Sequence, residues 1–235
     1  MEKNNFVLKS EPSKESWIEK VKIAKTARSP EELEDIAKLS EHVAVLMAVV
    51  QNPNATEEII ESIFEKTANN SYFNGYVFTA IAGSSKCSPE IFEKLAQLDD
   101  IRVGIALAKN PNATSKALDI LIEKNQPVLD VAAAENPNLS KEAIDKIIER
   151  GFSWALYHLT KNKNLTTEQL DKMAELPYET VIREVLKNEK TSEAAKQKVA
   201  QKLAEMDLKD LSYTEIELMQ KYTNPNDTIT SWLKK

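Results

Sequence analysis

The stretch VGIALAKNPNATSKALDILI, residues 103–122, is followed 26 residues later by a close copy, LDVAAAENPNLSKEAIDKII, residues 129–148. Weaker copies occupy residues 45–64, 77–96, 155–174 and 181–200. We use as an anchor the first residue of the turn in each copy, which is the first Asn of Asn-Pro-Asn in the two stretches above. The anchors are Asn52, Ser84, Asn110, Asn136, Asn162, Asn188 and Asn224. Four successive anchor spacings equal 26 residues, which is the signature of a tandem repeat. The two longer spacings indicate insertions, around residues 68–75 and 205–213.

Each copy predicts a short helix, a turn and a longer helix. Apolar residues recur seven and three places before the anchor, as at Val103 and Leu107, and this separation is about one helical turn. Four places after the anchor, all six copies have a Ser or Thr that can cap the next helix, and Thr114 is one example. Further along the chain, the spacing of Thr214 and Glu217 predicts a capping box, in which each side chain accepts a hydrogen bond from the backbone N–H of the other residue. Neither helix can bury its apolar face alone, so about seven such units must stack into an all-α solenoid.

The same pattern predicts how the 235 residues are organised. We expect residues 1–12 to be a mobile tail and residues 13–235 to be one solenoid domain. Within that domain, residues 14–42 form an N-terminal capping unit and residues 43–204 form the repeats. Residues 205–235, which contain a last Asn-Pro-Asn turn at Asn224, form the C-terminal capping unit.

Composition and charge narrow the classes of function. Hydrophobic residues make up 42% and charged residues 29%, whereas glycine occurs only four times, so sheets and glycine-rich phosphate loops are disfavoured. The net charge is −6 with both signs mixed, which argues against nucleic acid and anionic membranes as partners. The single cysteine, Cys87, cannot form an internal disulfide or a cysteine-based metal site alone. We therefore predict no cofactor and no metal. We also predict a cytoplasmic location, because the N-terminus has no signal-peptide pattern.

The core string, V-x-x-A-φ-A-x-N-P-N followed by a capped L-x-x-L helix, resembles the variant leucine-rich repeat (LRV) family. Residues 103–121 and 129–147 carry the resemblance best, and weaker copies extend it over most of residues 43–200. The resemblance implies a right-handed superhelix, HEAT-like in its helix pairs. The Arg that often follows the family's valine is missing here, as is the N-terminal cysteine cluster of the founding type, so no iron–sulfur cofactor is carried over.

Two copies depart from the others at equivalent positions. Four places before the anchor, the first four copies have Ala, whereas the next two have His158 and Glu184. One place earlier, the same two copies have Tyr157 and Arg183. We expect Tyr157 to lie beside Arg183, and His158 beside Glu184, on stacked helices. Together with Trp154, this group has the composition of an interaction hot spot. Alternatively, these large side chains fill gaps in a differently packed C-terminal half.

The insertion at residues 67–76 is a second candidate surface. It places Tyr72, Phe73 and Tyr76 among Asn and Gly residues, a composition typical of adaptable binding loops. Alternatively, these aromatic side chains fold back to cover the stack. By contrast, we interpret the repeated Asn residues as structural, because Asn bonds its own backbone in turns.

The leading hypothesis is a non-enzymatic, monomeric scaffold that binds a protein partner on the concave face of the solenoid. A His–Glu pair could transfer protons, but the sequence supplies no nucleophile with an orienting base, so we predict no enzyme. The alternative is a HEAT-like DNA-binding or DNA-glycosylase-type solenoid that uses Trp154, Asp130 and Arg183. Neutralisation of a toxin or other enzyme, as by an immunity protein, is a special case of the first hypothesis. The predicted partner-binding residues are Trp154, Tyr157, His158, Arg183, Glu184, Asp130, Tyr72, Phe73 and Tyr76.

Overall fold

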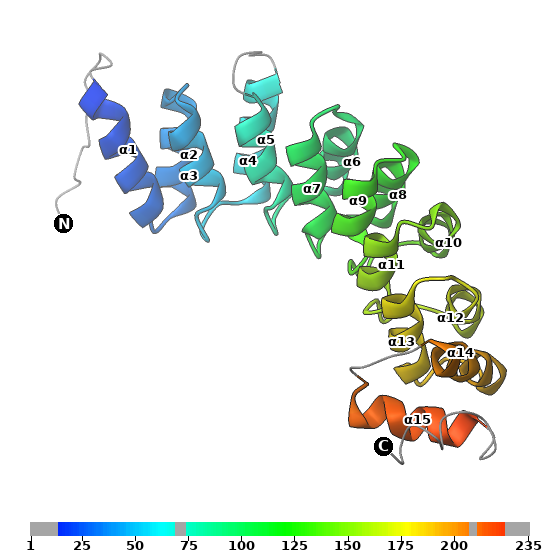
Figure 1. Cartoon of the computed structure of the whole chain (residues 1–235). Helices are drawn as coiled ribbons and strands as arrows, with labels where there is room; N and C mark the ends of the chain where they lie inside the picture. Colours follow the sequence, from blue (N-terminus) through cyan, green and yellow to red (C-terminus); the bar gives the residue numbers. More distant parts are fainter. Residues whose placement is uncertain (1–13, 69–73, 207–210, 224–235) are drawn as a thin grey trace. The chain divides into compact units, whose positions relative to one another are not determined.

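The computed structural model describes residues 14–68, 74–206 and 211–223, and within these ranges it contains fifteen helices and no strand (Figure 1). This confirms the predicted all-α repeat fold. The chain forms two compact units, residues 1–110 and 111–235. The predicted tail at residues 1–12, the side chains of Tyr72 and Phe73, and the Asn224 turn lie outside the described residues.

In the first unit, alternate helices form two rows. The helices are α1 (Lys14–Thr26), α2 (Pro30–Leu39), α3 (Val43–Val50), α4 (Glu57–Ala68), α5 (Asn74–Ala82), α6 (Pro89–Gln97) and α7 (Ile101–Lys109). The odd-numbered helices pack successively against one another, and α2 packs against α4 in the other row (Figure 1). The pairs α3–α4 and α5–α6 are each one copy of the repeat, residues 45–64 and 77–96.

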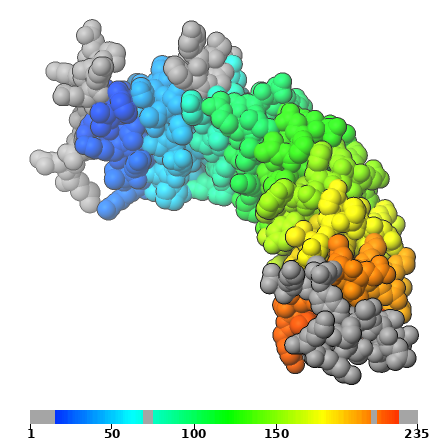
Figure 2. Space-filling view, in the orientation of Figure 1, coloured from blue at the N-terminus to red at the C-terminus, as the bar shows by residue number. Residues whose placement is uncertain are grey.

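The second unit has the same arrangement. Its helices are α8 (Ser115–Glu123), α9 (Pro127–Ala133), α10 (Lys141–Arg150), α11 (Ser153–Leu159), α12 (Thr167–Ala174), α13 (Glu179–Lys187), α14 (Glu193–Glu205) and α15 (Tyr213–Tyr222). One row runs α9, α11, α13, α15 and the other runs α8, α10, α12, α14. In the space-filling view the colours follow the sequence in order along each unit, because each repeat packs against its neighbours in the chain (Figure 2).

The predicted caps open the second helix of each repeat. The hydroxyl accepts a hydrogen bond from the backbone N–H three residues later, at 2.9 Å for Ser140 and 3.1 Å for Thr114. At the start of α15, however, the capping box is formed by Ser212 and Glu215, two residues before the predicted Thr214 and Glu217. The difference arises because the Glu215 carboxylate accepts a hydrogen bond from the Ser212 hydroxyl, at 2.6 Å, and another from an arginine of α13.

The anchor asparagines join each repeat to the one before it. Asn162, which is buried, donates from its side-chain amide to the carbonyls of Ala134 (2.8 Å) and Asn136 (3.0 Å). Its Oδ1 accepts from the backbone N–H of Asn164 at 2.9 Å. In the first unit, Asn52 and Asn110 bond the preceding repeat in the same way. The structural interpretation of these residues is confirmed, and it extends to bonds between repeats.

Candidate functional site

The aromatic side chains predicted at residues 154–158 lie on α11, in the odd-numbered row of the second unit. Ala155, Leu156 and Leu159 of this helix are buried in the stack. Helical periodicity then turns Trp154, Tyr157 and His158 outward, because they occupy the opposite face. The exposed fraction of Trp154 is 69%, among the largest of the described apolar side chains, whereas Tyr157 and His158 are half-buried.

The three rings form one cluster. The ring centroids of Trp154 and Tyr157 are 6.4 Å apart, with planes at 89°, which is an edge-to-face arrangement. His158 lies 6.4 Å from the Trp154 ring and 5.7 Å from the Tyr157 ring, between centroids. These are attractive aromatic contacts, and they hold the cluster in a defined arrangement although Trp154 is largely in solvent.

Two charged groups complete the site, Glu135 from the preceding repeat and Lys161 from the same repeat as the rings. His158 Nδ1 lies 2.7 Å from Glu135 Oε1, and Lys161 Nζ donates to the same oxygen at 3.2 Å. The hydrogen bond from His158, with a further one from Lys161, lowers the pKa of Glu135. Lys161 Nζ also lies 5.0 Å from the centroid of the Tyr157 ring. His158 is thus paired with Glu135, whereas Glu184, its predicted neighbour, bonds Lys187 at 2.6 Å.

Arg183 holds two helices of the odd-numbered row together. Its Nε and Nη2 donate to the two carboxylate oxygens of Glu215 at 2.7 and 2.8 Å, and Nη1 donates to Glu179 at 3.1 Å. Glu215 is almost completely buried, and the hydrogen bonds from Arg183 lower its pKa to about 2. This bidentate pair fastens α15 to α13, so the geometry supports a structural role for Arg183.

Asp130 lies inside the second unit. Its side chain is completely buried, at a position where other copies have Leu, Ile, Phe or Gly, and its Oδ1 accepts a hydrogen bond from Arg150 Nη1 at 2.8 Å. Arg150 also donates to the carbonyl of Ile122 at 2.7 Å. Asp130 Oδ2 has no hydrogen-bond partner among the described residues, and burial raises the Asp130 pKa. A carboxylate in this position does not reach the surface of the site.

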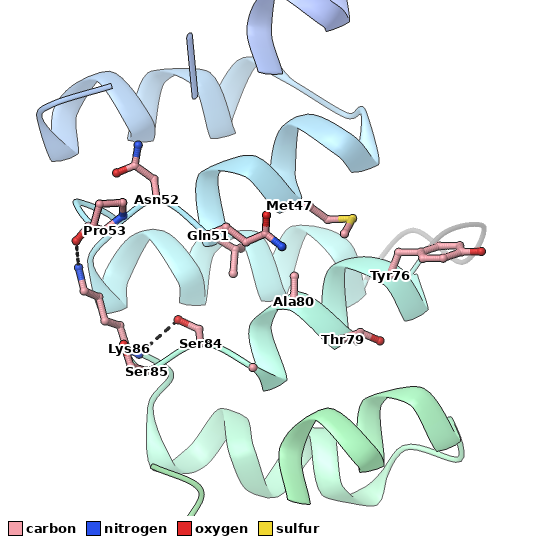
Figure 3. Close-up of a pocket in the computed structure, with 12 residues that line it drawn as sticks. Met47, Gln51, Asn52, Pro53, Tyr76, Thr79, Ala80, Ser84, Ser85 and Lys86 are labelled. Carbon is pink, nitrogen blue, oxygen red and sulfur yellow. Dashed lines mark hydrogen bonds between the residues drawn. The ribbon is translucent and has the colours of Figure 1, made fainter. Parts of the chain in front are cut away.

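Tyr76 is the one aromatic residue of the insertion whose side chain the structure describes. It is 54% exposed, with the Cζ of Arg102 4.8 Å from its ring centroid. It stands at one end of a groove of about 480 Å³ between α3 and α5 (Figure 3). Met47, Thr79 and Ala80 line the middle of the groove, and the turns that follow α3 and α5 close the other end.

The Lys86 ammonium in that second turn donates to the carbonyls of Pro53 and Ala55, so it ties the turns of two repeats together. Asn138, which also stands two places after its anchor, bonds the Pro111 and Ala113 carbonyls of the preceding turn in the same way.

The groove and the α11 cluster belong to different units of the chain. Within the second unit, Trp154, Tyr157 and His158 form one cluster, whereas Asp130 is buried and Arg183 bonds Glu215 and Glu179.

Two chemical features bear on other classes of site. Burial raises the pKa of the Cys87 thiol to about 12, so it is protonated at neutral pH and is a poor nucleophile. In the described part of the chain, no three His, Cys, Asp or Glu side chains gather in a way that could hold a metal ion. Among the same residues, no helix has both the length and the apolar character needed to cross a membrane.

Glu135, Lys161 and Arg150 belong to the sites described above, but the sequence comparison did not single them out. Glu135 and Lys161 both stand one place before their anchors, where charge varies from copy to copy. That variation is the signal that could have identified them.

In comparisons with known proteins, no family model, curated protein or solved structure matches this chain.

Proposed function

We propose that this protein is a non-enzymatic scaffold that binds a protein partner through the odd-numbered helix row of its second unit. We define the α11 patch as Val128, Glu135, Trp154, Tyr157, His158 and Lys161. The observation that carries the proposal is the 69% exposure of Trp154 beside two other aromatic rings. Burying this indole on a partner would contribute a large hydrophobic gain, and Trp and Tyr are enriched in interaction hot spots.

The exposure and composition of the α11 patch support partner binding over the alternative that its large side chains fill gaps in the helix stack. A side chain that fills a gap in the stack is buried, whereas Trp154 leaves most of its surface in solvent. Val128 of α9 is 45% exposed and occupies the position equivalent to Trp154 on the helix that packs against α11. Glu135 and Lys161, each about half exposed, supply a polar rim. An apolar centre with a charged rim is the usual anatomy of a protein interface.

The DNA-glycosylase alternative receives less support from the same residues. Asp130 would have to reach a substrate, but it is buried against Arg150, and Arg183 is committed to Glu215. A toxin-neutralising role is a particular form of partner binding and remains within the proposal. The proposal also retains an LRV-type, cytoplasmic, monomeric protein, as the sequence predicts.

The test is recovery of a partner from a native lysate with the wild-type protein and with a Trp154→Ala, Tyr157→Ala double variant, identified by mass spectrometry. We expect the double variant to lose the partner, with at least about a thirtyfold weaker Kd, since removal of a hot-spot side chain costs about 2 kcal/mol or more. Tyr213→Ala is the matched control, because Tyr213 is an exposed aromatic residue (83%) on another helix of the row.

Both variants must keep the wild-type helical content and Tm for the comparison to count. Full binding by a folded double variant would refute the choice of the α11 patch. Salt-sensitive binding to a DNA duplex at about 50 mM salt would instead favour the nucleic-acid alternative.

A further inference from the structure

The α11 patch already holds a cation that belongs to the chain itself. The ammonium of Lys161 lies 5.0 Å from the centre of the Tyr157 ring and 3.2 Å from Glu135 Oε1. An aromatic face and a carboxylate are the two groups that bind a basic side chain best at a protein surface. The patch is therefore built to accept positive charge.

A second position of the same kind lies beside the first. Trp154 has the aromatic ring that attracts cations most strongly, and most of it is exposed. His158 lies against this indole and also bonds Glu135, so it connects the Trp154 ring with the carboxylate. The hydrogen bonds described for Glu135, from His158 and Lys161, are both to Oε1. The Glu135 side chain is 49% exposed, so a partner can approach the other oxygen, Oε2.

Resting on the proposed function, we propose that the α11 patch binds an arginine side chain of the protein partner. The guanidinium stacks on the Trp154 indole and donates a hydrogen bond to Glu135 Oε2, while apolar residues beside the arginine pack on Val128. Arginine fits better than lysine because its planar, weakly hydrated head stacks on aromatic rings while it bonds a carboxylate. The net charge of −6 also favours association with a basic partner.

Two variants of the rim should change binding in opposite directions. Glu135→Gln removes the carboxylate charge and should weaken binding of an arginine up to about fivefold, the usual range for an exposed ion pair. Lys161→Met removes the resident cation that competes for Glu135, so it should strengthen binding by up to about the same factor. In a purely hydrophobic patch Glu135→Gln would not weaken binding, and Lys161→Met would strengthen binding of charged and uncharged peptides alike.

The probe is the pentapeptide acetyl-Gly-Leu-Arg-Leu-Gly-amide, compared with the same peptide carrying citrulline, which has nearly the shape of arginine without its charge. The full chain carries Trp17→Phe and Trp232→Phe, so that the remaining indole fluorescence comes from Trp154. We expect the arginine peptide to change this fluorescence saturably and to bind about threefold to thirtyfold more tightly than the citrulline peptide. Glu135→Gln should reduce this difference and Lys161→Met should increase it.

Equal binding of the two peptides would overturn the arginine assignment. It would do so independently of the proposed function, which is tested by partner recovery with the Trp154→Ala, Tyr157→Ala variant. If that variant loses the partner while the peptides bind equally, the patch is an interface of another chemistry. If it keeps the partner and the peptides also bind equally, both proposals fail.

Discussion

Asn162 offers the most direct test of how the repeats are joined. Replacement by Ala removes two hydrogen bonds donated to the preceding repeat, at 2.8 and 3.0 Å, and one accepted from Asn164 at 2.9 Å. Each bond contributes about 1 kcal/mol net, so we expect Asn162→Ala to lower the free energy of unfolding by about 3 kcal/mol. The side chain is only 3% exposed, so water cannot easily replace the lost partners.

Two further substitutions separate the donor and acceptor roles of this side chain. Ser84, the anchor of another repeat, accepts a bond from the backbone N–H of Lys86 at 3.2 Å. Asn162→Ser should therefore keep the acceptor and cost about 2 kcal/mol. Asn162→Asp also keeps an acceptor, but it sets a buried carboxylate against two carbonyl oxygens and should cost at least as much as Ala.

The assay is urea denaturation followed by circular dichroism at 222 nm, with the m value as a check on the unfolding model. Asn164→Ala is a suitable control, because it removes only the bond from an exposed amide to the Pro137 carbonyl. A cost below about 1 kcal/mol for Asn162→Ala, together with wild-type stability for Asn162→Asp, would refute the reasoning.

Three other predictions concern ionisable groups. Hydrogen bonds from Arg183 lower the folded-state pKa of Glu215 to about 2, so this carboxylate stabilises the protein above its unfolded pKa and the contribution is lost as pH falls through 2. Glu215→Gln should therefore cost roughly 2 to 3 kcal/mol at pH 7 and almost nothing at pH 2, by urea denaturation. Burial raises the folded-state pKa of Asp130, so its stabilising contribution is complete below the unfolded pKa and is lost as pH rises through the folded one. Asp130→Asn should remove that loss, and an unchanged stability–pH curve above about pH 4 would contradict this. Because its buried thiol has a pKa of about 12, Cys87 should react with a disulfide reagent such as DTNB at pH 8 only at the rate of unfolding, and fast labelling of the native protein would show that the thiol is accessible.

The sequence identified the aromatic residues of the candidate site but not their partners. His158 was expected beside Glu184, 26 residues later, from the repeat spacing alone. The hydrogen bond that the structure gives its ring is to Glu135, 23 residues earlier. Glu135 lies in the turn two places after α9 ends at Ala133, so His158 reaches this turn of the preceding repeat and not the equivalent position of a helix. Sequence spacing cannot reveal this partner, because the choice depends on how neighbouring helices pack and on how far their polar side chains reach.

For polar residues, the sequence did not predict whether the side chain is buried or exposed. Arg183 was a surface candidate because it departs from the residues at equivalent positions of other copies, and Asp130 was one through the DNA-glycosylase alternative. The fold instead places Asp130 inside, against Arg150, and gives Arg183 a buried carboxylate on the next helix of its row. Both ion-pair partners lie 20 or more residues away in the chain, on other helices. No local pattern marks such a pair.

By itself, the amino-acid sequence determined the order of the helices and the caps of the six copies, because helical periodicity and capping act between residues within about four places of one another. It also determined that the repeats must stack, since neither helix of a copy can bury its apolar face alone. Only the tertiary structure decided which polar side chains meet across repeats, and so which ones remain exposed around Trp154. That choice depends on the stagger and tilt of packed helices, which arise from contacts between residues far apart in the chain.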